Sequence, residues 1–423
     1  MSTVAWVFGC SCSVMPEWLA VFRSRRMAAV FLLGFSSGLP LLLVGQTLVQ
    51  RLIDAKFDDQ TIAVVSAFGL PYTFKWAWAP LLDRYDMPFL GRRRGWILVF
   101  QLVVIAGLLA MGWYGPQRDF EVFVVLTIAV ATAAASQDIV IDAYNTDILT
   151  PSERAAGSAA YVMGYRTAML VAGMLALILA DHLAWEAVYS LMAGLMVIGV
   201  IGVLVAERPT NAETAPKTIA ESVYLPFRTF FTRYGRHAVV LLAFAATYKF
   251  GEQFLAVMIP KFYRTLGFTK SEIGVLSKFV TFAAFAVGGG LGGSLVARYG
   301  LARMLIAFGM LQAATNLVYV AMAYTGHNLV VFGVAAFIEN LSAATATAAF
   351  SAALMSFCSS GTSATQMALL TSLSSVGQRV FGFSAGIVVE RYGYVALFIA
   401  AIALALPGLV LARAAMAGAG DVE

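Results

Sequence analysis

Two aspartates in an apolar stretch are the residues whose types and spacing most directly suggest chemistry in this sequence. Asp138 and Asp142 belong to the segment SQDIVIDAY (residues 136–144), which follows the apolar run VFVVLTIAVATAAA. Residues four apart lie on one face of a helix, whereas Gln137 points about a third of a turn away. Neighbouring carboxylates repel each other, so one of them takes up a proton readily unless a cation compensates. The spacing therefore indicates a site that can bind and release a proton.

Two basic residues in other apolar segments are expected at a similar depth. Lys75 and Arg166 lie, like the aspartates, roughly 9–17 Å from the same helix ends at a rise of about 1.5 Å per residue. For Asp138 we favour a role in transport over a permanent ion pair with Lys75 or Arg166. For Asp142, the shallower carboxylate, we favour an ion-pair latch with a basic loop over a transport role.

The second half of the chain carries its own intramembrane charges. Lys249, Glu252, Lys278, Glu339 and Arg379 contribute three bases and two acids, whereas the charges of the first half balance. This excess favours an anionic solute. Glu339, near the middle of its predicted helix and followed by Asn340, is a second candidate for proton coupling.

Uncharged polar and aromatic side chains complete the candidate binding site. Gln46, Gln137, Gln253 and Gln378 are able to bond sugar hydroxyls or amides, but bonds between helices are an equally good explanation. Trp76 and Tyr248 are candidates for stacking on sugar rings, and packing between helices is the alternative. We expect these residues, with Lys75, Arg166, Lys249, Glu252, Asn340 and Arg379, to form the substrate site.

The elements that must position these residues are membrane-spanning helices. The chain of 423 residues is 60% hydrophobic and 12% charged, with a mean hydropathy of +0.82, whereas soluble domains are about 25% charged. A bilayer-spanning helix needs about 20 apolar residues. Twelve segments meet this requirement: 27–53, 61–82, 96–115, 120–147, 155–180, 184–206, 238–262, 271–297, 302–325, 328–356, 364–389 and 393–412.

The longest polar segment divides the helices into six and six. We expect an N-terminal cytoplasmic segment (1–26), a six-helix bundle (27–206), a cytoplasmic linker (207–237), a second six-helix bundle (238–412) and a C-terminal tail (413–423). The stretch FDDQTIAVVSAF (57–68) also aligns with FTKSEIGVLSKF (268–279). Two repeated halves are typical of transporters that bind their substrate between them.

Basic residues predict the orientation of the chain. With both termini inside, sixteen Lys or Arg lie on the cytoplasmic side and seven on the other, which agrees with the positive-inside rule. We therefore expect a multi-pass protein of a bacterial inner membrane with both termini in the cytoplasm. The first residues lack a basic n-region, and we expect no signal peptide there.

The loop after the second helix has the sequence LDRYDMPFLGRRRG (residues 82–95). It resembles the Asp-Arg-x-Gly-Arg-Arg motif of the major facilitator superfamily, with a longer insert before the glycine. The glycine permits a tight turn, and the acid and arginines are able to form a breakable ion-pair latch. A basic anchor alone is the other explanation. The residues expected in the latch are Asp83, Arg84, Gly91, Arg92, Arg93, Arg94 and Asp142.

Further segments are similar to the AmpG permease family. They are GFSSGLPL (34–41), FKWAWAPLLDRY (74–85), SQDIVIDAY, YKFGEQ (248–253), FIENL (337–341) and SATQMALL (363–370). The resemblance implies a major facilitator fold of two pseudo-symmetric six-helix bundles and proton-coupled import of anhydromuropeptides for peptidoglycan recycling. Its wider clan also contains siderophore permeases and acetyl-CoA transporters, which remain the second and third substrate classes.

Other classes of protein are disfavoured. Three cysteines and three histidines show no HExxH or GxSxG pattern, so we expect no enzyme, metal site or cofactor. The ionisable residues are spread over many helices and do not repeat as the rings of a channel would. The net charge of +5 reflects basic loops and does not indicate nucleic acid. The expected partners are an anionic solute, protons and lipid, with the protein as a monomer.

Overall fold

The structure is a computed structural model that describes the backbone of residues 24–57, 70–209, 218–256, 258–359, 362–374 and 376–420. Within these ranges every regular element is helical. Most of the predicted N-terminal segment 1–26 lies outside the described residues. The expected all-helical membrane architecture is confirmed.

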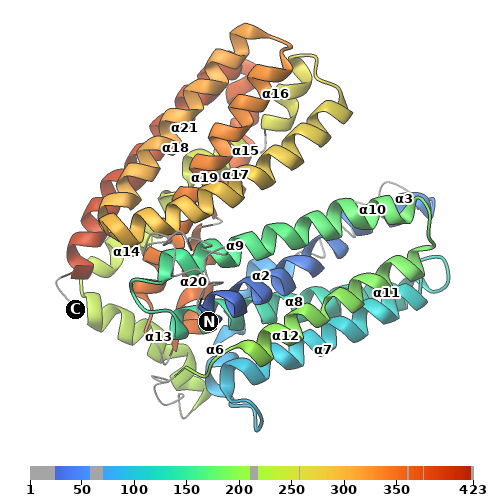
Figure 1. Ribbon diagram of the computed structural model, residues 1–423. Coiled ribbons are helices and arrows are strands. Elements are labelled where there is room, and N and C mark those ends of the chain that lie inside the picture. The colour runs from blue at the N-terminus through green and yellow to red at the C-terminus, as the bar shows by residue number, and fades with distance from the viewer. Residues whose placement is uncertain are drawn as a thin grey trace, which may run out of the picture.

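The first bundle contains the helices between residues 25 and 205 (Figure 1). They are α2 (Arg25–Leu43), α3 (Gln46–Asp54), α5 (Leu70–Phe74), η3 (Lys75–Ala77), α6 (Ala79–Arg84), α7 (Arg92–Trp113), α8 (Phe120–Ile148), α9 (Arg154–Leu170), η4 (Val171–Leu175), α10 (Ala176–Ala180), α11 (Trp185–Leu195) and α12 (Val197–Val205).

The second bundle follows a separate connecting helix, α13 (Ile219–Tyr234). Its helices are α14 (His237–Thr247), α15 (Phe250–Ala256), α16 (Ile259–Thr265), α17 (Lys270–Tyr299), α18 (Leu301–Thr325), α19 (Leu329–Phe357), α20 (Ser363–Ser374) and α21 (Val376–Gly420). Helix α21 joins two straight helices at Gly393, whose φ of 79° favours glycine.

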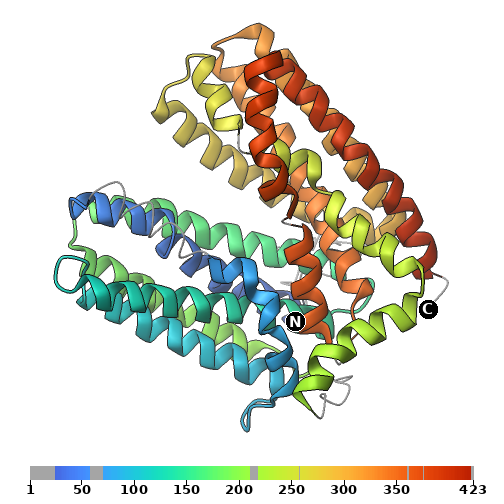
Figure 2. The same ribbon diagram turned by 180° about the vertical axis from the view of Figure 1, so that it is seen from behind.

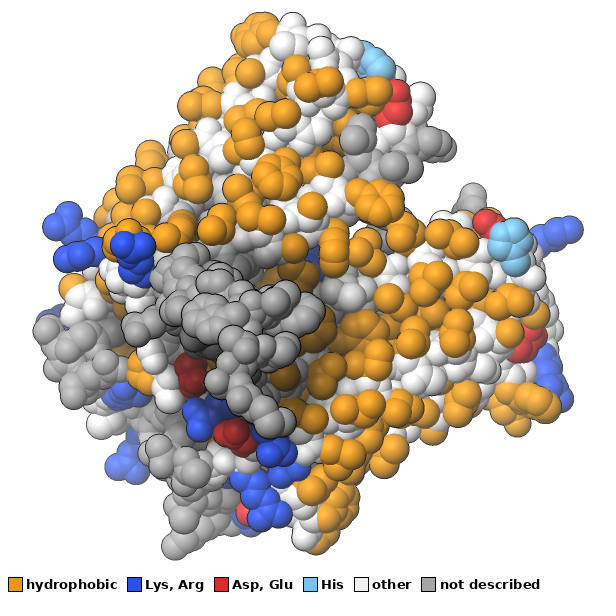
Figure 3. All heavy atoms as spheres, in the orientation of Figure 1, with side chains coloured by type: hydrophobic (Ala, Val, Ile, Leu, Met, Phe, Trp, Pro, Cys, Tyr) orange, Lys and Arg blue, Asp and Glu red, His pale blue; other side chains and the backbone are white. Residues whose placement is uncertain are grey.

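Ten helical stretches of the described chain are long and apolar enough to cross a membrane. Of the twelve predicted spans, the second lies partly outside the described residues and the eleventh is divided between α20 and α21. Hydrophobic side chains cover the visible flanks of both bundles (Figure 3). Because this apolar surface has no other partner in the fold, it matches the hydrocarbon of a bilayer.

Small residues let helices within each bundle pack closely. A Cβ atom on Gly34 of α2 would lie 2.3 Å from the carbonyl oxygen of Tyr161 on α9, and one on Gly164 would lie 2.0 Å from that of Phe31. In the second bundle, a Cβ on Gly288 of α17 would lie 2.7 Å from the Leu341 carbonyl of α19. Such backbone approach is the usual basis of helix association in membranes.

The two bundles touch at one end and diverge toward the other (Figures 1 and 2). We call the end where the described chain starts and stops the terminal end. There α20 packs against α6 and α8, and α13 spans from α6 to α20, while α9 lies along α17 nearer the middle. A residue that faces the other bundle therefore lies either in the contact at the terminal end or beside the space that opens between the bundles beyond this contact.

Candidate functional site

A buried cluster of one lysine and two aspartates lies inside the first bundle. The ammonium nitrogen of Lys75 is 3.1 Å from Oδ2 of Asp138 and 3.4 Å from Oδ2 of Asp142. Asp138 also accepts hydrogen bonds from the hydroxyls of Ser37 and Tyr161 through its Oδ1. The three charged side chains are only 9–15% exposed. The cluster therefore carries one negative charge more than its lysine balances.

Interrupted helical geometry positions Lys75 against α8. Residues 75–77 form a single 3-10 turn (η3) between the short helices α5 and α6. The indole nitrogen of Trp78 donates to the hydroxyl of Ser136 at 2.9 Å, which fixes this turn next to the aspartates. Pro80 lies in the first turn of α6, where its missing N–H is tolerated. Breaks of this kind place polar groups beside a cavity in transporters.

The four charges expected in one layer are only partly brought together. Asp138, Asp142 and Lys75 meet as their spacing suggests, but Arg166 does not join them. Its guanidinium lies over the ring of Phe285 on α17, with 4.2 Å between the guanidinium carbon and the ring centroid. Arg166 therefore faces the second bundle.

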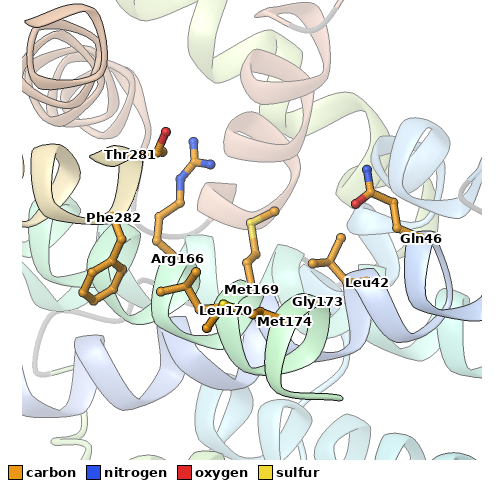
Figure 4. Close-up of a pocket in the computed structure, with 9 residues that line it drawn as sticks. All are labelled: Leu42, Gln46, Arg166, Met169, Leu170, Gly173, Met174, Thr281 and Phe282. Carbon is orange, nitrogen blue, oxygen red and sulfur yellow. The ribbon is translucent and has the colours of Figure 1, made fainter. Parts of the chain in front are cut away.

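Arg166 lines a cavity of about 200 Å³ between the two bundles. Figure 4 shows its side chain extending from α9 toward Thr281 of α17, with Gln46 on the other side of the space. Within the part of the chain that the structure describes, no carboxylate lies within 4.0 Å of this guanidinium. Its electrostatic neighbours in the second bundle are Glu252 and Glu339.

A second polar cluster lies in the C-terminal bundle. Lys249, in the break between α14 and α15, donates to Glu252 at 2.6 Å and to Thr347 at 2.9 Å. Gln312 donates to the same carboxylate at 2.6 Å. The side-chain amide of Gln253 donates a hydrogen bond to the carbonyl of Ser374. Lys249, Glu252 and Gln253 line a cavity of about 250 Å³.

Several predicted ligands point elsewhere. Gln137 is fully buried and donates to Ser36 inside the first bundle, so it does not reach the cavity. The hydroxyl of Tyr248 donates to the carbonyl of Leu305, and its ring stacks on Phe350 with centroids 5.0 Å apart. The Tyr248 hydroxyl already has a partner and is not available to a solute. The side-chain oxygen of Gln137, in contrast, is buried without a hydrogen-bond partner among the described residues.

The positions of the remaining predicted residues neither support nor exclude a role in substrate binding. Trp76 is exposed on η3, and Asn340 donates to the Ala336 carbonyl of its own helix. Glu339 is partly buried and has Lys249 among its electrostatic neighbours. The side chains of Lys278, Gln378 and Arg379 lie outside the described part of the chain, so the charge excess of the second bundle stays a prediction.

An ion-pair network closes the terminal end around Arg93. Its guanidinium is 2.9 Å from Oδ1 of Asp83 and 2.8 Å from Oδ2 of Asp147. A third bond, of 2.7 Å, runs to the hydroxyl of Ser363 in the other bundle. This hydroxyl in turn donates to Asp147. The arginine and the two acids are almost fully buried, so their charges depend on one another for compensation.

Asp83 also holds the start of α20 across the interface between the bundles. Its carboxylate accepts hydrogen bonds from the backbone N–H groups of Ala364 and Thr365 and from the Thr365 hydroxyl at 2.7 Å. A carboxylate at a helix N-terminus meets unpaired N–H groups and the positive end of the helix dipole. The contact thus joins α6 to α20 and keeps the bundles together at this end.

The prediction that Asp142 belongs to this latch is wrong in the structure. Asp142 is bound to Lys75, and the carboxylate that reaches Arg93 is Asp147, five residues further along α8. Since five residues add about 7.5 Å along a helix, Asp147 lies closer to the terminal end. Asp147, Ser363 and Thr365 were missed, although all three stand in or beside segments that carry the family resemblance.

The other predicted latch residues surround Arg93. Arg92 donates to the Asp83 carbonyl and lies 3.9 Å from Asp86, and Arg94 donates to the Val203 carbonyl. Gly91, with a φ of 77°, forms the tight turn expected of it. Arg84 lies over the ring of Tyr85. Arg93 alone of the three consecutive arginines reaches the second bundle in the bonds described above.

Comparisons with known proteins agree with this architecture. The family model described as Major Facilitator Superfamily matches residues 26–377. The anhydromuropeptide permease of Escherichia coli K12 is 42% identical over 397 residues, covering 93% of this chain and 80% of the permease. A putative transporter AmpG 4 of Rickettsia conorii is 30% identical, and the alignment covers 92% of this chain and 96% of that protein.

Solved structures share the fold at low sequence identity. The human organic anion transporter MFSD10 superposes with a TM-score of 0.68 at 16% identity, covering 94% of this chain and 99% of the transporter. The transporter FucP in its outward conformation superposes with a TM-score of 0.66 at 14% identity, covering 93% of this chain and 97% of FucP.

Two bundles of membrane-spanning helices that meet around a polar interface define a secondary transporter, a permease rather than an enzyme. The chain belongs to the major facilitator superfamily and, within it, to the family of AmpG-type permeases.

The network at the terminal end predicts a conformational effect of Asp83→Asn. The amide loses the charge that binds Arg93 and the α20 N-terminus, and hydrogen bonds to a charged group contribute about 1.5–3 kcal/mol. We expect spin labels at Tyr85 and Tyr299, exposed positions on the two bundles at this end, to show a longer mean distance in electron resonance measurements.

The matched control is Asp86→Asn, because Asp86 is 68% exposed and lies at the edge of the same loop. This variant should leave the distance distribution unchanged. Equal distributions in wild type and Asp83→Asn would contradict the assignment of Asp83 as a closing contact.

Proposed function

We propose that this protein imports GlcNAc-anhydroMurNAc peptides across a bacterial inner membrane, coupled to protons, for peptidoglycan recycling. The relative from E. coli, 42% identical over almost the whole chain, is named an anhydromuropeptide permease. The observation within the molecule that supports coupling is the buried cluster of Lys75, Asp138 and Asp142. The relatives named above favour muropeptides over the siderophore and acetyl-CoA alternatives, and neither alternative is retained.

The sequence favours Asp138 for the transport role, but the contacts within the cluster lead us to assign proton exchange to Asp142. Asp138 accepts hydrogen bonds from Ser37, Tyr161 and Lys75. Among the described residues, the Asp142 carboxylate is bonded to the lysine alone, at the longer distance of 3.4 Å. One positive charge compensates one carboxylate well, so the less bonded carboxylate is the one that takes up a proton. Glu339 remains a second candidate in the other bundle.

Arg166 is the cation that we assign to the substrate. It lines the space between the bundles, and its charge faces acids without a close ion pair among the described residues. Muropeptides carry carboxylates, which arginine binds through paired hydrogen bonds. Gln46 in the same cavity, and Lys249 and Glu252 in a separate cavity of the second bundle, supply further polar groups.

The arrangement suggests how access alternates. The bundles are held together at the terminal end by Asp83 and diverge at the other, so the cavity opens away from the termini (Figures 1 and 2). With both termini in the cytoplasm, as the basic loops favour, this conformation faces the periplasm. We further propose that the two six-helix bundles, 27–206 and 238–412, move as units and that the protein acts as a monomer.

Uptake by spheroplasts tests the proposed function. Cells expressing the protein should accumulate labelled GlcNAc-anhydroMurNAc peptide, and a protonophore should abolish accumulation because the proton gradient supplies the driving force. Uptake of a labelled ferric siderophore serves as the comparison. If the siderophore alone is accumulated, the substrate assignment is wrong.

The proton role of Asp142 predicts a separation of two activities. Asp142→Asn removes the exchangeable proton, so accumulation should fall to simple equilibration while exchange of labelled for unlabelled substrate continues. Asp86→Asn, at the exposed edge of the loop, should behave as wild type in both assays. Full accumulation by Asp142→Asn would show that the cluster is a structural ion pair.

The substrate role of Arg166 predicts a change in affinity. Arg166→Gln loses charged hydrogen bonds of about 1.5–3 kcal/mol, which corresponds to a rise in KM of about 10-fold or more. Arg118→Gln is the control, because Arg118 is exposed and lies over Trp113, away from the cavity residues. An unchanged KM in Arg166→Gln would exclude the guanidinium as a substrate ligand.

A further inference from the structure

The connecting helix α13 is amphipathic and lies against the terminal end of the second bundle. Thr218 and Glu221 form a capping box at its start, and Pro226, Phe230 and Tyr234 recur at four-residue intervals on its buried face. This face anchors the helix to the protein, because the Gln366 side chain of α20 donates to the Pro226 carbonyl there. Figures 1 and 2 show α13 running between the two bundles at this end.

A second apolar stripe of α13 faces outward. Val223, Tyr224, Phe227 and Phe231 are all exposed, Tyr224 by 63%. On an ideal helix they lie beside the buried face, and Arg228 lies beyond them on the polar side. A helix with an exposed aromatic stripe next to arginines is typical of segments that lie in the membrane interface.

An apolar cavity of about 250 Å³ lies between α13 and the helices α14 and α20 of the second bundle. It is lined by Pro226, Phe227, Phe230 and Phe231 of α13, by Leu242 of α14, and by Thr365, Gln366, Leu369, Leu370 and Leu373 of α20. Phe227 and Phe231 belong to the outward stripe as well, so the cavity borders the surface that faces lipid.

The two polar side chains in the lining are already bonded to protein. The Thr365 hydroxyl donates to Asp83. The Gln366 amide donates to the Pro226 carbonyl and to Thr229, and its oxygen accepts the Ser359 N–H. A cavity without free polar groups does not hold ordered water and instead takes an apolar guest.

We propose that this cavity binds one acyl chain of an anionic phospholipid whose headgroup contacts Arg228 and Arg236. Leu242 belongs to the membrane-spanning stretch His237–Thr265, and Leu373 belongs to the predicted span 364–389, so the cavity lies where acyl chains are present. Arg228 and Arg236 are exposed at the same end of the molecule, and α13 contributes one acid, Glu221, which caps its own helix. Basic residues next to the membrane attract anionic headgroups.

The lipid would act on the closed contact at the terminal end. Gln366 ties α20 to α13, and the neighbouring Thr365 is held by Asp83 of the other bundle. A chain that fills the space between α13 and α20 stabilises α20 in this position. Bound phospholipid therefore favours the conformation that is closed at the terminal end, and this effect does not depend on the identity of the substrate.

The experiment uses the full-length protein purified from membranes that contain phosphatidylglycerol and analysed by native mass spectrometry. Wild type should retain one phosphatidylglycerol after washing with detergent, and Leu373→Trp, which fills the cavity, should lose it. Val410→Trp is the matched control, because Val410 is 71% exposed on α21 and outside the cavity. Equal retention by wild type and Leu373→Trp would overturn the proposal.

A second measurement distinguishes binding of the headgroup from binding of the acyl chain. It does not use the tryptophan variant, so a disturbance of packing by tryptophan does not affect it. In nanodiscs, the preference for phosphatidylglycerol over phosphatidylcholine should weaken by about fivefold for each arginine lost in Arg228→Gln and Arg236→Gln. Glycerol phosphate, which has the headgroup charge but no acyl chain, should not displace the lipid. An unchanged preference, or displacement by glycerol phosphate, would contradict a site that recognises both parts.

Discussion

The cost of an uncompensated charge in hydrocarbon governs this structure. A charge at the centre of a bilayer costs about 2.5–3.5 kcal/mol on insertion scales, so every ionisable side chain there must meet a partner or a polar space. Lys75 meets two aspartates, Lys249 meets Glu252, and Arg93 meets Asp83 and Asp147. Helix breaks at η3 and between α14 and α15 are what bring the two lysines to these partners.

The same constraint makes the charges useful for transport. A carboxylate that shares its cation with another is poised to take up a proton, and a guanidinium that faces a cavity is poised to bind an anion. At the terminal end, Asp83 satisfies both Arg93 in its own bundle and the first N–H groups of α20 in the other. Separating the bundles there removes the α20 N–H groups from Asp83 and the Ser363 hydroxyl from Arg93, which links the conformational change to local electrostatics.

The fold was predictable from the sequence because hydrophobic length and the polar linker are local properties. The common depth of Lys75, Asp138 and Asp142 was predictable too, since i and i+4 positions share a helix face and helix limits give depth, but the pairing of Asp142 with Lys75 was not. Contacts between the bundles were not. Ser363 lies 270 residues from Arg93 and 216 from Asp147, so no local pattern relates them. Composition does not reveal that the amide nitrogen of Gln137 and the hydroxyl of Tyr248 donate to partners within their own bundles.

Under the proposed proton coupling, substrate and protons move together, and this coupling is measured as the pH change in a lightly buffered suspension of proteoliposomes. With no membrane potential and no initial pH gradient, adding GlcNAc-anhydroMurNAc peptide outside should make the external medium more alkaline as protons enter with the substrate. Substrate entry with no change in external pH would contradict proton coupling by this permease.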